Sequence, residues 1–142
     1  MAFKLVKGPS DTIHYYCGTS SAVTEGSLVV ADRSGGIVIK GTAALLTEDT
    51  VGVATKTPAT ADTTVPVIPC RGRAQVWEWD TTNNTATNQL CKRHLLTDSL
   101  NVNNTSSDVA LDETVVEAVE NVGAAADKKQ RGHILVVGGA VS

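Results

Sequence analysis

The sequence predicts an all-β fold, a small β-barrel or β-sandwich of short antiparallel strands. The apolar content is mostly Val and Ala, and Thr is abundant. Side chains branched at Cβ favour the pleated surface of a sheet. Turn signals also recur about every ten residues, a spacing typical of sandwiches and barrels. Aromatic residues make up only 4% of the chain, so we expect a thin core.

We expect a single domain, residues 11–142, preceded by an extended N-terminal arm, residues 1–10. The 142 residues are the size of one ordinary domain. The arm alternates apolar and cationic residues and ends at the turn signal Gly8-Pro9-Ser10. Phe3 and Leu5 lie two positions apart, so an extended backbone places both on one side.

Each expected strand is a short run rich in Val, Ile, Thr or aromatic residues between turn residues. In order, the expected strands are residues 12–17, 27–32, 36–40, 51–55, 63–69, 73–80, 114–122 and 133–137. Gly35-Gly36 marks a hairpin, because glycine takes the positive φ of tight turns. Pro66 lacks a backbone donor, so we expect its strand at a sheet edge or with a bulge.

The second half of the chain is less regular. Asn84 or Thr85 can cap a short helix over residues 87–91, and we expect at most this one short helix. The Asn-, Ser- and Thr-rich tract 98–108 indicates a loop with at most one short strand, and residues 123–130 a polar turn. Four valines in residues 114–122 fit a helical face, but their branching favours the strand.

Composition and charge exclude several classes of protein. A net charge of −3 argues against non-specific nucleic-acid binding, which needs clustered cations. No run approaches the roughly 20 apolar residues of a membrane span, and the N-terminal residues do not match a signal peptide. Three cysteines at long spacings fit reduced thiols. We therefore expect synthesis in a cytoplasm, without a nucleic-acid or membrane partner.

The sequence does not indicate a catalytic or metal site. Three Cys and three His could bind zinc, but no short Cys or His pair is present, so we expect no metal and no cofactor. A triad assembles from distant positions, which leaves a small hydrolase using His14, His94 or His133 as an alternative. Because there is no Gly-x-Ser-x-Gly elbow, we expect a protein that is not an enzyme.

Two features indicate contact with a partner. Trp77 and Trp79 share one face of a strand, where they can form the core, a contact surface or a platform for a sugar ring. Arg71-Gly72-Arg73 and Lys92-Arg93-His94 are short basic clusters. If these clusters converge, they can meet an acidic partner surface and steer docking.

Several short segments of strand and turn residues follow one another in the first half of the chain. They are Gly18-Thr19, Ala22-Val23-Thr24-Glu25-Gly26-Ser27-Leu28-Val29-Val30, Gly36-Ile37-Val38, Val51-Gly52-Val53-Ala54 and Val65-Pro66-Val67-Ile68-Pro69. This order resembles the head decoration, or cement, proteins of tailed bacteriophages. The resemblance covers roughly the first half of the chain.

The resemblance implies a structural virion protein that binds the outer surface of an assembled capsid and stabilises it by bridging major capsid protein subunits. It also implies self-association, with a trimer favoured, and an arm that reaches neighbouring subunits. The residues we expect at capsid or intersubunit contacts are Phe3, Leu5, Arg71, Arg73, Trp77 and Trp79. The alternative is a carbohydrate- or receptor-binding β-module that uses Trp77 and Trp79.

Overall fold

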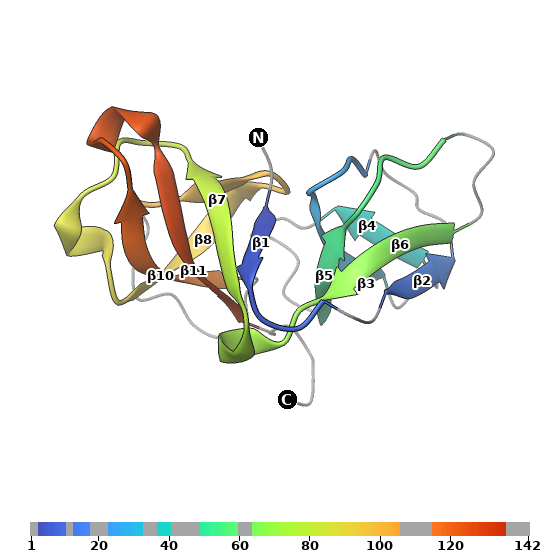
Figure 1. The fold of residues 1–142 in the computed structure, drawn as a ribbon. Coiled ribbons are helices and arrows are strands. Elements are labelled where there is room, and N and C mark those ends of the chain that lie inside the picture. The colour runs from blue at the N-terminus through green and yellow to red at the C-terminus, as the bar shows by residue number, and fades with distance from the viewer. Residues whose placement is uncertain are drawn as a thin grey trace.

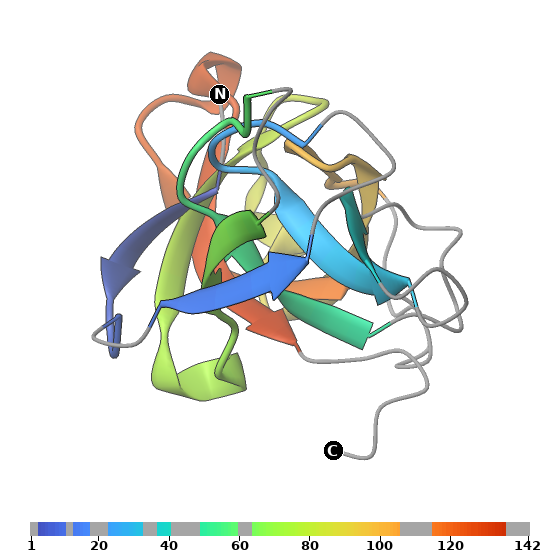
Figure 2. The same ribbon diagram turned by 90° about the vertical axis from the view of Figure 1, so that its right-hand side faces the viewer.

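A computed structural model describes residues 3–10, 13–17, 23–32, 37–40, 49–59, 64–105 and 115–135. Within these residues the chain forms two β-sheets and three short 3₁₀ helices. The predicted all-β class is confirmed, but the three short helices exceed the one that was expected. Figure 1 shows the two sheets side by side, with the N-terminal strand β1 between them. Figure 2 shows the molecule with the second sheet toward the viewer.

The first sheet contains six strands in the spatial order β1-β7-β11-β10-β8-β9. Their bounds are β1 (Lys4–Lys7), β7 (Val76–Thr81), β8 (Lys92–Asp98), β9 (Asn101–Asn103), β10 (Val115–Val122) and β11 (Lys129–Leu135). β9 also pairs with β7 in parallel, so β7, β11, β10, β8 and β9 close into a barrel. β1 adds to the first half of β7, outside that ring.

The second sheet is antiparallel, with the order β2-β6-β5-β3-β4. Its strands are β2 (His14–Cys17), β3 (Leu28–Asp32), β4 (Ile37–Lys40), β5 (Asp49–Ala54) and β6 (Thr64–Pro69). The 3₁₀ helices are η1 (Gly72–Ala74), η2 (Thr87–Gln89) and η3 (Ala125–Asp127).

Each strand expected from the sequence is present within the described residues, with ends shifted by a few positions. The segment 114–122, which fitted either a helix or a strand, forms the strand β10, as its Cβ-branched valines favoured. Two strands, β1 and β8, were not expected. β8 begins with three basic residues, and these conceal the alternation that buries His94 and Leu96. The last part of the strand expected over residues 133–137 lies outside the described residues.

The prediction that Pro66 lies in an edge strand or at a bulge is wrong for β6, because β6 has a neighbour on each side and neither pairing has a register shift. β2 pairs with residues 64–67, whereas β5 pairs only with residues 67–69. Pro66 therefore lies just beyond the β5 ladder. Its carbonyl still accepts a hydrogen bond from Thr55 N at 3.0 Å, and its missing donor interrupts no cross-strand pair with β5.

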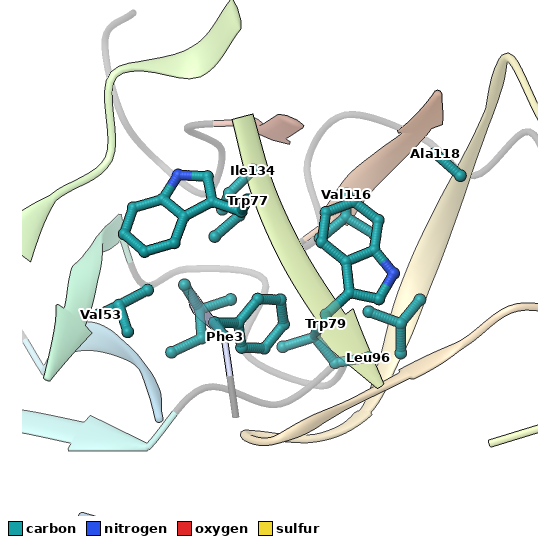
Figure 3. Close-up of a cluster of buried hydrophobic side chains, with 10 residues drawn as sticks. Phe3, Val53, Trp77, Trp79, Leu96, Val116, Ala118 and Ile134 are labelled. Carbon is teal, nitrogen blue, oxygen red and sulfur yellow. The ribbon is translucent and has the colours of Figure 1, made fainter. Parts of the chain in front are cut away.

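One hydrophobic cluster joins the two sheets, and a second, smaller cluster lies in the second sheet. Trp77 and Trp79 each expose only 1% of their surface and lie within the first cluster. Leu28 and Val53 enter the same cluster from the second sheet. Figure 3 shows Phe3 beside the two indoles, and its ring centroid lies 6.0 Å from that of Trp79. The few aromatic side chains therefore supply the bulk of a core that is otherwise made of small residues.

The expected N-terminal arm does not extend away from the domain. Its residues form β1, which pairs with β7 through Lys4↔Glu78 and Leu5↔Trp77. Phe3 is 3% exposed and its N–H donates to Gly26 O at 3.0 Å. Burying a Phe side chain is worth about 1.5–3 kcal/mol. The alternation of apolar and cationic residues that suggested an arm thus belongs to a strand that packs one face against the core.

Candidate partner-binding surface

The six residues expected at contacts have three different environments. Phe3, Trp77 and Trp79 belong to the buried core, so their side chains are not available to a partner. Of the three interpretations of the tryptophan pair, the structure supports the core. A sugar platform needs an exposed ring face, and neither indole has one. Leu5 is partly buried against the core.

Arg71 and Arg73 are exposed, as a contact role requires. They flank and enter η1, the short turn that leads from β6 into β7. Gln75 fixes this turn, because its Oε1 accepts from Arg71 N at 2.8 Å. Its Nε2 donates to Pro9 O at 2.8 Å and Pro69 O at 3.0 Å. A fully buried amide therefore holds an exposed, basic turn in place.

The two basic clusters do converge, and they meet at Glu117 of β10. Arg73 Nε donates to Glu117 Oε1 at 3.1 Å and Nη2 to Oε2 at 2.8 Å, which is a bidentate pair. Arg93 lies directly opposite Glu117 on β8, and His133 lies opposite it on β11. We call Arg71, Arg73, Arg93 and Glu117 the arginine cluster.

The second basic cluster converges only in part. Successive residues of a strand point to opposite faces, so Arg93 faces outward while His94 is buried in the barrel at 1% exposure. His94 Nε2 lies 2.8 Å from Gln89 O. Reading Lys92-Arg93-His94 as one basic surface was therefore wrong for His94.

Electrostatics within the arginine cluster favour the charged forms. The hydrogen bond from Arg73, with the nearby charges of Arg73, His133 and Arg93, holds the pKa of Glu117 below its ordinary value. The same pair raises the pKa of Arg73. The Arg73 side chain is 65% exposed and that of Glu117 22%, so water screens the pair and leaves the guanidinium accessible.

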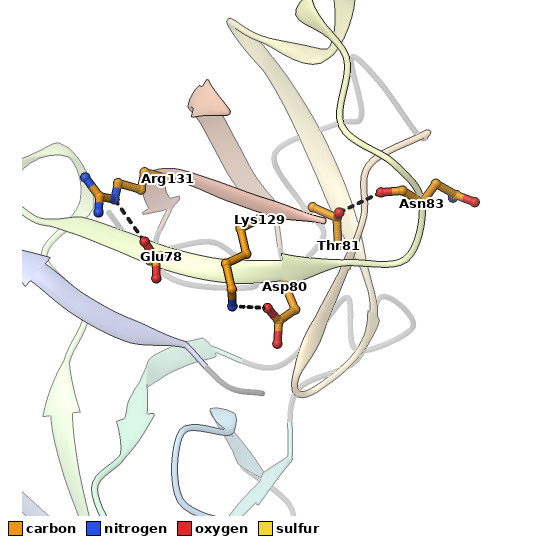
Figure 4. A network of polar contacts seen from close by, with 6 residues as sticks. All are labelled: Glu78, Asp80, Thr81, Asn83, Lys129 and Arg131. Atoms are coloured by element: carbon orange, nitrogen blue, oxygen red, sulfur yellow. Dashed lines mark hydrogen bonds and ion pairs between the residues drawn. The ribbon is translucent and has the colours of Figure 1, made fainter. Parts of the chain in front are cut away.

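Elsewhere on the outer face of the barrel, charges are matched. Arg131 Nε lies 3.0 Å from Glu78 Oε1, and Lys129 Nζ lies 2.7 Å from Asp80 Oδ1 (Figure 4). Arg131 Nη1 also lies 3.9 Å from Glu120 Oε1. The arginine cluster differs because Arg73 and Arg93 share one carboxylate, that of Glu117, while Arg71 is exposed just before Arg73. Among the described residues of this face, the cluster has more cations than carboxylates.

Desolvation is the largest influence on the pKa of Asp80 and raises it. The hydrogen bond and charge of Lys129 act in the opposite direction, and with the other contacts they leave the pKa below its ordinary value. Its partner Lys129 has a raised pKa, chiefly through the same hydrogen bond. This ion pair fastens the start of β11 to the end of β7.

Two of the three histidines proposed as hydrolase bases, His94 and His133, contact backbone oxygens. His133 Nδ1 lies 2.8 Å from the backbone oxygen of Gln75, and His94 Nε2 lies at the same distance from that of Gln89. The side chain of His14 lies outside the described residues. Neither of these two contacts is to a Ser or Cys side chain, so neither is the nucleophile–base pair that a hydrolase requires.

Within the described part of the chain, no group of three His, Cys, Asp or Glu residues is arranged to hold a metal ion. No helix in this part is long and apolar enough to cross a membrane. Burial raises the pKa of the Cys70 thiol to about 12. Searches of the chain against protein-family models, curated proteins and solved structures find no match.

Proposed function

We propose that this chain is a structural virion protein that binds the outer surface of an assembled phage capsid and cements it by bridging major capsid protein subunits. The observation that carries the proposal is the arginine cluster, in which two distant segments bring the exposed Arg73 and the half-buried Arg93 together at Glu117 on a β-scaffold. Arginine is enriched at protein interfaces because its planar fork pairs with carboxylates. The resemblance of the first half to decoration proteins adds to this support.

The mechanism requires no chemistry. A protein that binds the assembled shell and not the free subunits stabilises the shell by RT ln(1 + [L]/Kd), about 2.7 kcal/mol at a hundredfold excess over Kd. Carboxylates on the capsid would take over Arg73 from Glu117 and engage Arg93. When one copy contacts several subunits, later contacts are effectively intramolecular, which raises the avidity. The resemblance also implies that the protein forms a trimer. A mass measurement in solution distinguishes a trimer from a 14.8 kDa monomer.

Heating purified shells with and without the protein tests the proposal. We expect bound protein to raise the disassembly temperature, and the double variant Arg73→Glu with Arg93→Glu to abolish binding. Lys56→Glu with Lys128→Glu changes net charge equally at other exposed positions and serves as the matched control. Wild-type protein that does not bind shells would refute the function. Equal binding by the arginine variant would refute the docking surface alone.

A further inference from the structure

An open groove of about 370 Å³ lies where β1 meets the second sheet. Most of its lining is apolar and comes from both sheets: Phe3, Leu5, Val53, Ala54, Ile68 and Trp77. Lys4, Glu25, Gly26 and Thr55 complete the lining. The volume suits one large apolar side chain together with a short stretch of backbone. Figure 3 shows Phe3, Val53 and Trp77 around this junction.

The backbone of β1 offers hydrogen-bonding groups to this groove. β7 alternates its partners, because Thr81 N donates to Lys128 O beside β11 and Thr82 N donates to Val102 O of β9. The backbone N–H and C=O groups of the even-numbered residues of β7 therefore point toward the edge of β7 that pairs with β9 and β1. Glu78 belongs to this set and pairs with Lys4, so the backbone groups of Lys4 point at β7.

The backbone groups of the next residue of β1, Leu5, must then point away from β7. Leu5 lies opposite Trp77, whose backbone groups face β11. Phe3, two positions before Leu5, already donates away from β7 to Gly26 O at 3.0 Å. The N–H and C=O of Leu5 therefore face the groove. Among the described residues, no hydrogen bond to these two groups is found outside the strand ladder, so β1 has a short free edge.

The charges along this edge select its partner. Lys4 and Lys7 are exposed, and Glu78, the cross-strand neighbour of Lys4, is paired with Arg131 at 3.0 Å. No ion pair of Lys4 is present among the described residues. A second copy docking antiparallel about Leu5 would set Lys4 opposite Val6 and supply no carboxylate for it. A register that pairs Phe3 with Leu5 would set Lys4 against Lys4, and like charges directly opposite are destabilising. A strand carrying carboxylates opposite Lys4 is favoured instead.

We propose that the groove and the free edge of β1 bind an extended, acidic segment of a partner protein by strand addition. The added strand exchanges main-chain hydrogen bonds with Leu5, and one large aliphatic side chain enters the groove beside Leu5 and Ile68, the partly buried apolar members of its lining. Carboxylates on either side of this anchor face outward, where one lies opposite Lys4. This docking site is separate from the arginine cluster and does not depend on capsid binding.

Three blocked pentapeptides provide the probes: Thr-Glu-Leu-Glu-Thr, Thr-Lys-Leu-Lys-Thr and Thr-Glu-Gly-Glu-Thr. The readout is amide hydrogen exchange and chemical shift in ¹⁵N-labelled protein. The acidic leucine peptide should shift the Leu5 amide, and at about a ninefold excess over Kd it should slow its exchange about tenfold by mass action. The glycine peptide lacks the anchor and should have no effect at the same concentration.

Reversing the charge of residue 4 distinguishes this docking from non-specific peptide binding. In Lys4→Glu, the preference between the acidic and basic leucine peptides should reverse, with each affinity changing about fivefold, the upper range for a cross-strand pair. Lys128→Glu makes the same charge change far along the chain from β1 and should leave the preference unchanged. Lys4 is exposed, so we expect both variants to fold.

Three outcomes would overturn the proposal. The first is a Leu5 amide that no peptide affects, and the second is an unchanged preference in Lys4→Glu. The third is a Leu5 resonance that broadens with protein concentration alone, because this would make a second copy the occupant. None of these results bears on whether the protein binds shells.

Discussion

Gly132 of β11 is the position where one added methyl group should do most damage. A Cβ atom there would lie 1.9 Å from the backbone oxygen of Glu117 and 2.8 Å from Cη2 of Trp79. Ordinary van der Waals contact begins near 3.4 Å, so the Glu117 oxygen must move by about 1.5 Å (3.4 − 1.9). The nearest atom belongs to the backbone of β10, and a side-chain rotation cannot relieve the contact.

The cost of Gly132→Ala follows from what must give way. Moving β10 this far from β11 breaks one or two ladder hydrogen bonds, each worth about 1 kcal/mol net. Overpacking Trp79 adds about 1–3 kcal/mol. Alanine loses less backbone entropy than glycine on folding, which returns about 0.5–1 kcal/mol. We therefore expect the free energy of unfolding to fall by about 3 kcal/mol.

Urea unfolding followed by tryptophan fluorescence measures this loss, and Trp79 itself reports the strain. Gly72→Ala is the matched control, since an added Cβ there has no neighbour within 4 Å. Gly72 has a φ of 57°, so its alanine variant should lose only about 1 kcal/mol. If Gly132→Ala were no less stable than Gly72→Ala, the close packing of β10, β11 and Trp79 would be wrong.

Three further predictions rest on individual side chains. Brief alkylation of native protein at pH 8 should label the exposed Cys91 and spare Cys70, whose pKa is raised to about 12, as peptide mapping would show. Glu117 and Asp80 have lowered pKa values, so their stabilisation is complete above the unfolded values near 4 and is lost as the pH falls through the folded ones. The urea midpoint should thus fall less between pH 6 and pH 3 in Glu117→Gln with Asp80→Asn than in wild type; an equal fall would count against the pairs. Gln75→Leu should lower the free energy of unfolding by about 2–3 kcal/mol, because Arg71 N and two carbonyl groups lose their partner. A calorimetric scan measures this, and an unchanged melting temperature would contradict it.

The local pattern of the sequence predicted much of the fold. Runs such as residues 64–69 carry Cβ-branched side chains between turn residues, and these preferences act within a few positions of the chain. β8 was missed because its first three residues are basic, and only the paired strand shows which of them face outward. The environment of Phe3 was also missed, because an exposed arm and a half-buried strand have the same alternation.

The candidate site was predicted only in its parts. The two basic clusters were visible in the sequence, but Glu117, which joins them, carries no signal of its own in a strand of valines. Its role depends on cross-strand register, which places Arg93 and His133 on either side of it. Register is a property of pairs of strands and cannot be read from one strand alone.

The sequence by itself determined that this chain forms short strands and turns, since branching, glycine and proline act locally on φ, ψ and χ1. Only the tertiary structure decided which strands pair, how five of them close into a barrel, and which side of each strand is buried. Trp77 and Trp79 show the difference. Their spacing fixes that they share a face, but whether that face meets solvent or the core depends on long-range packing.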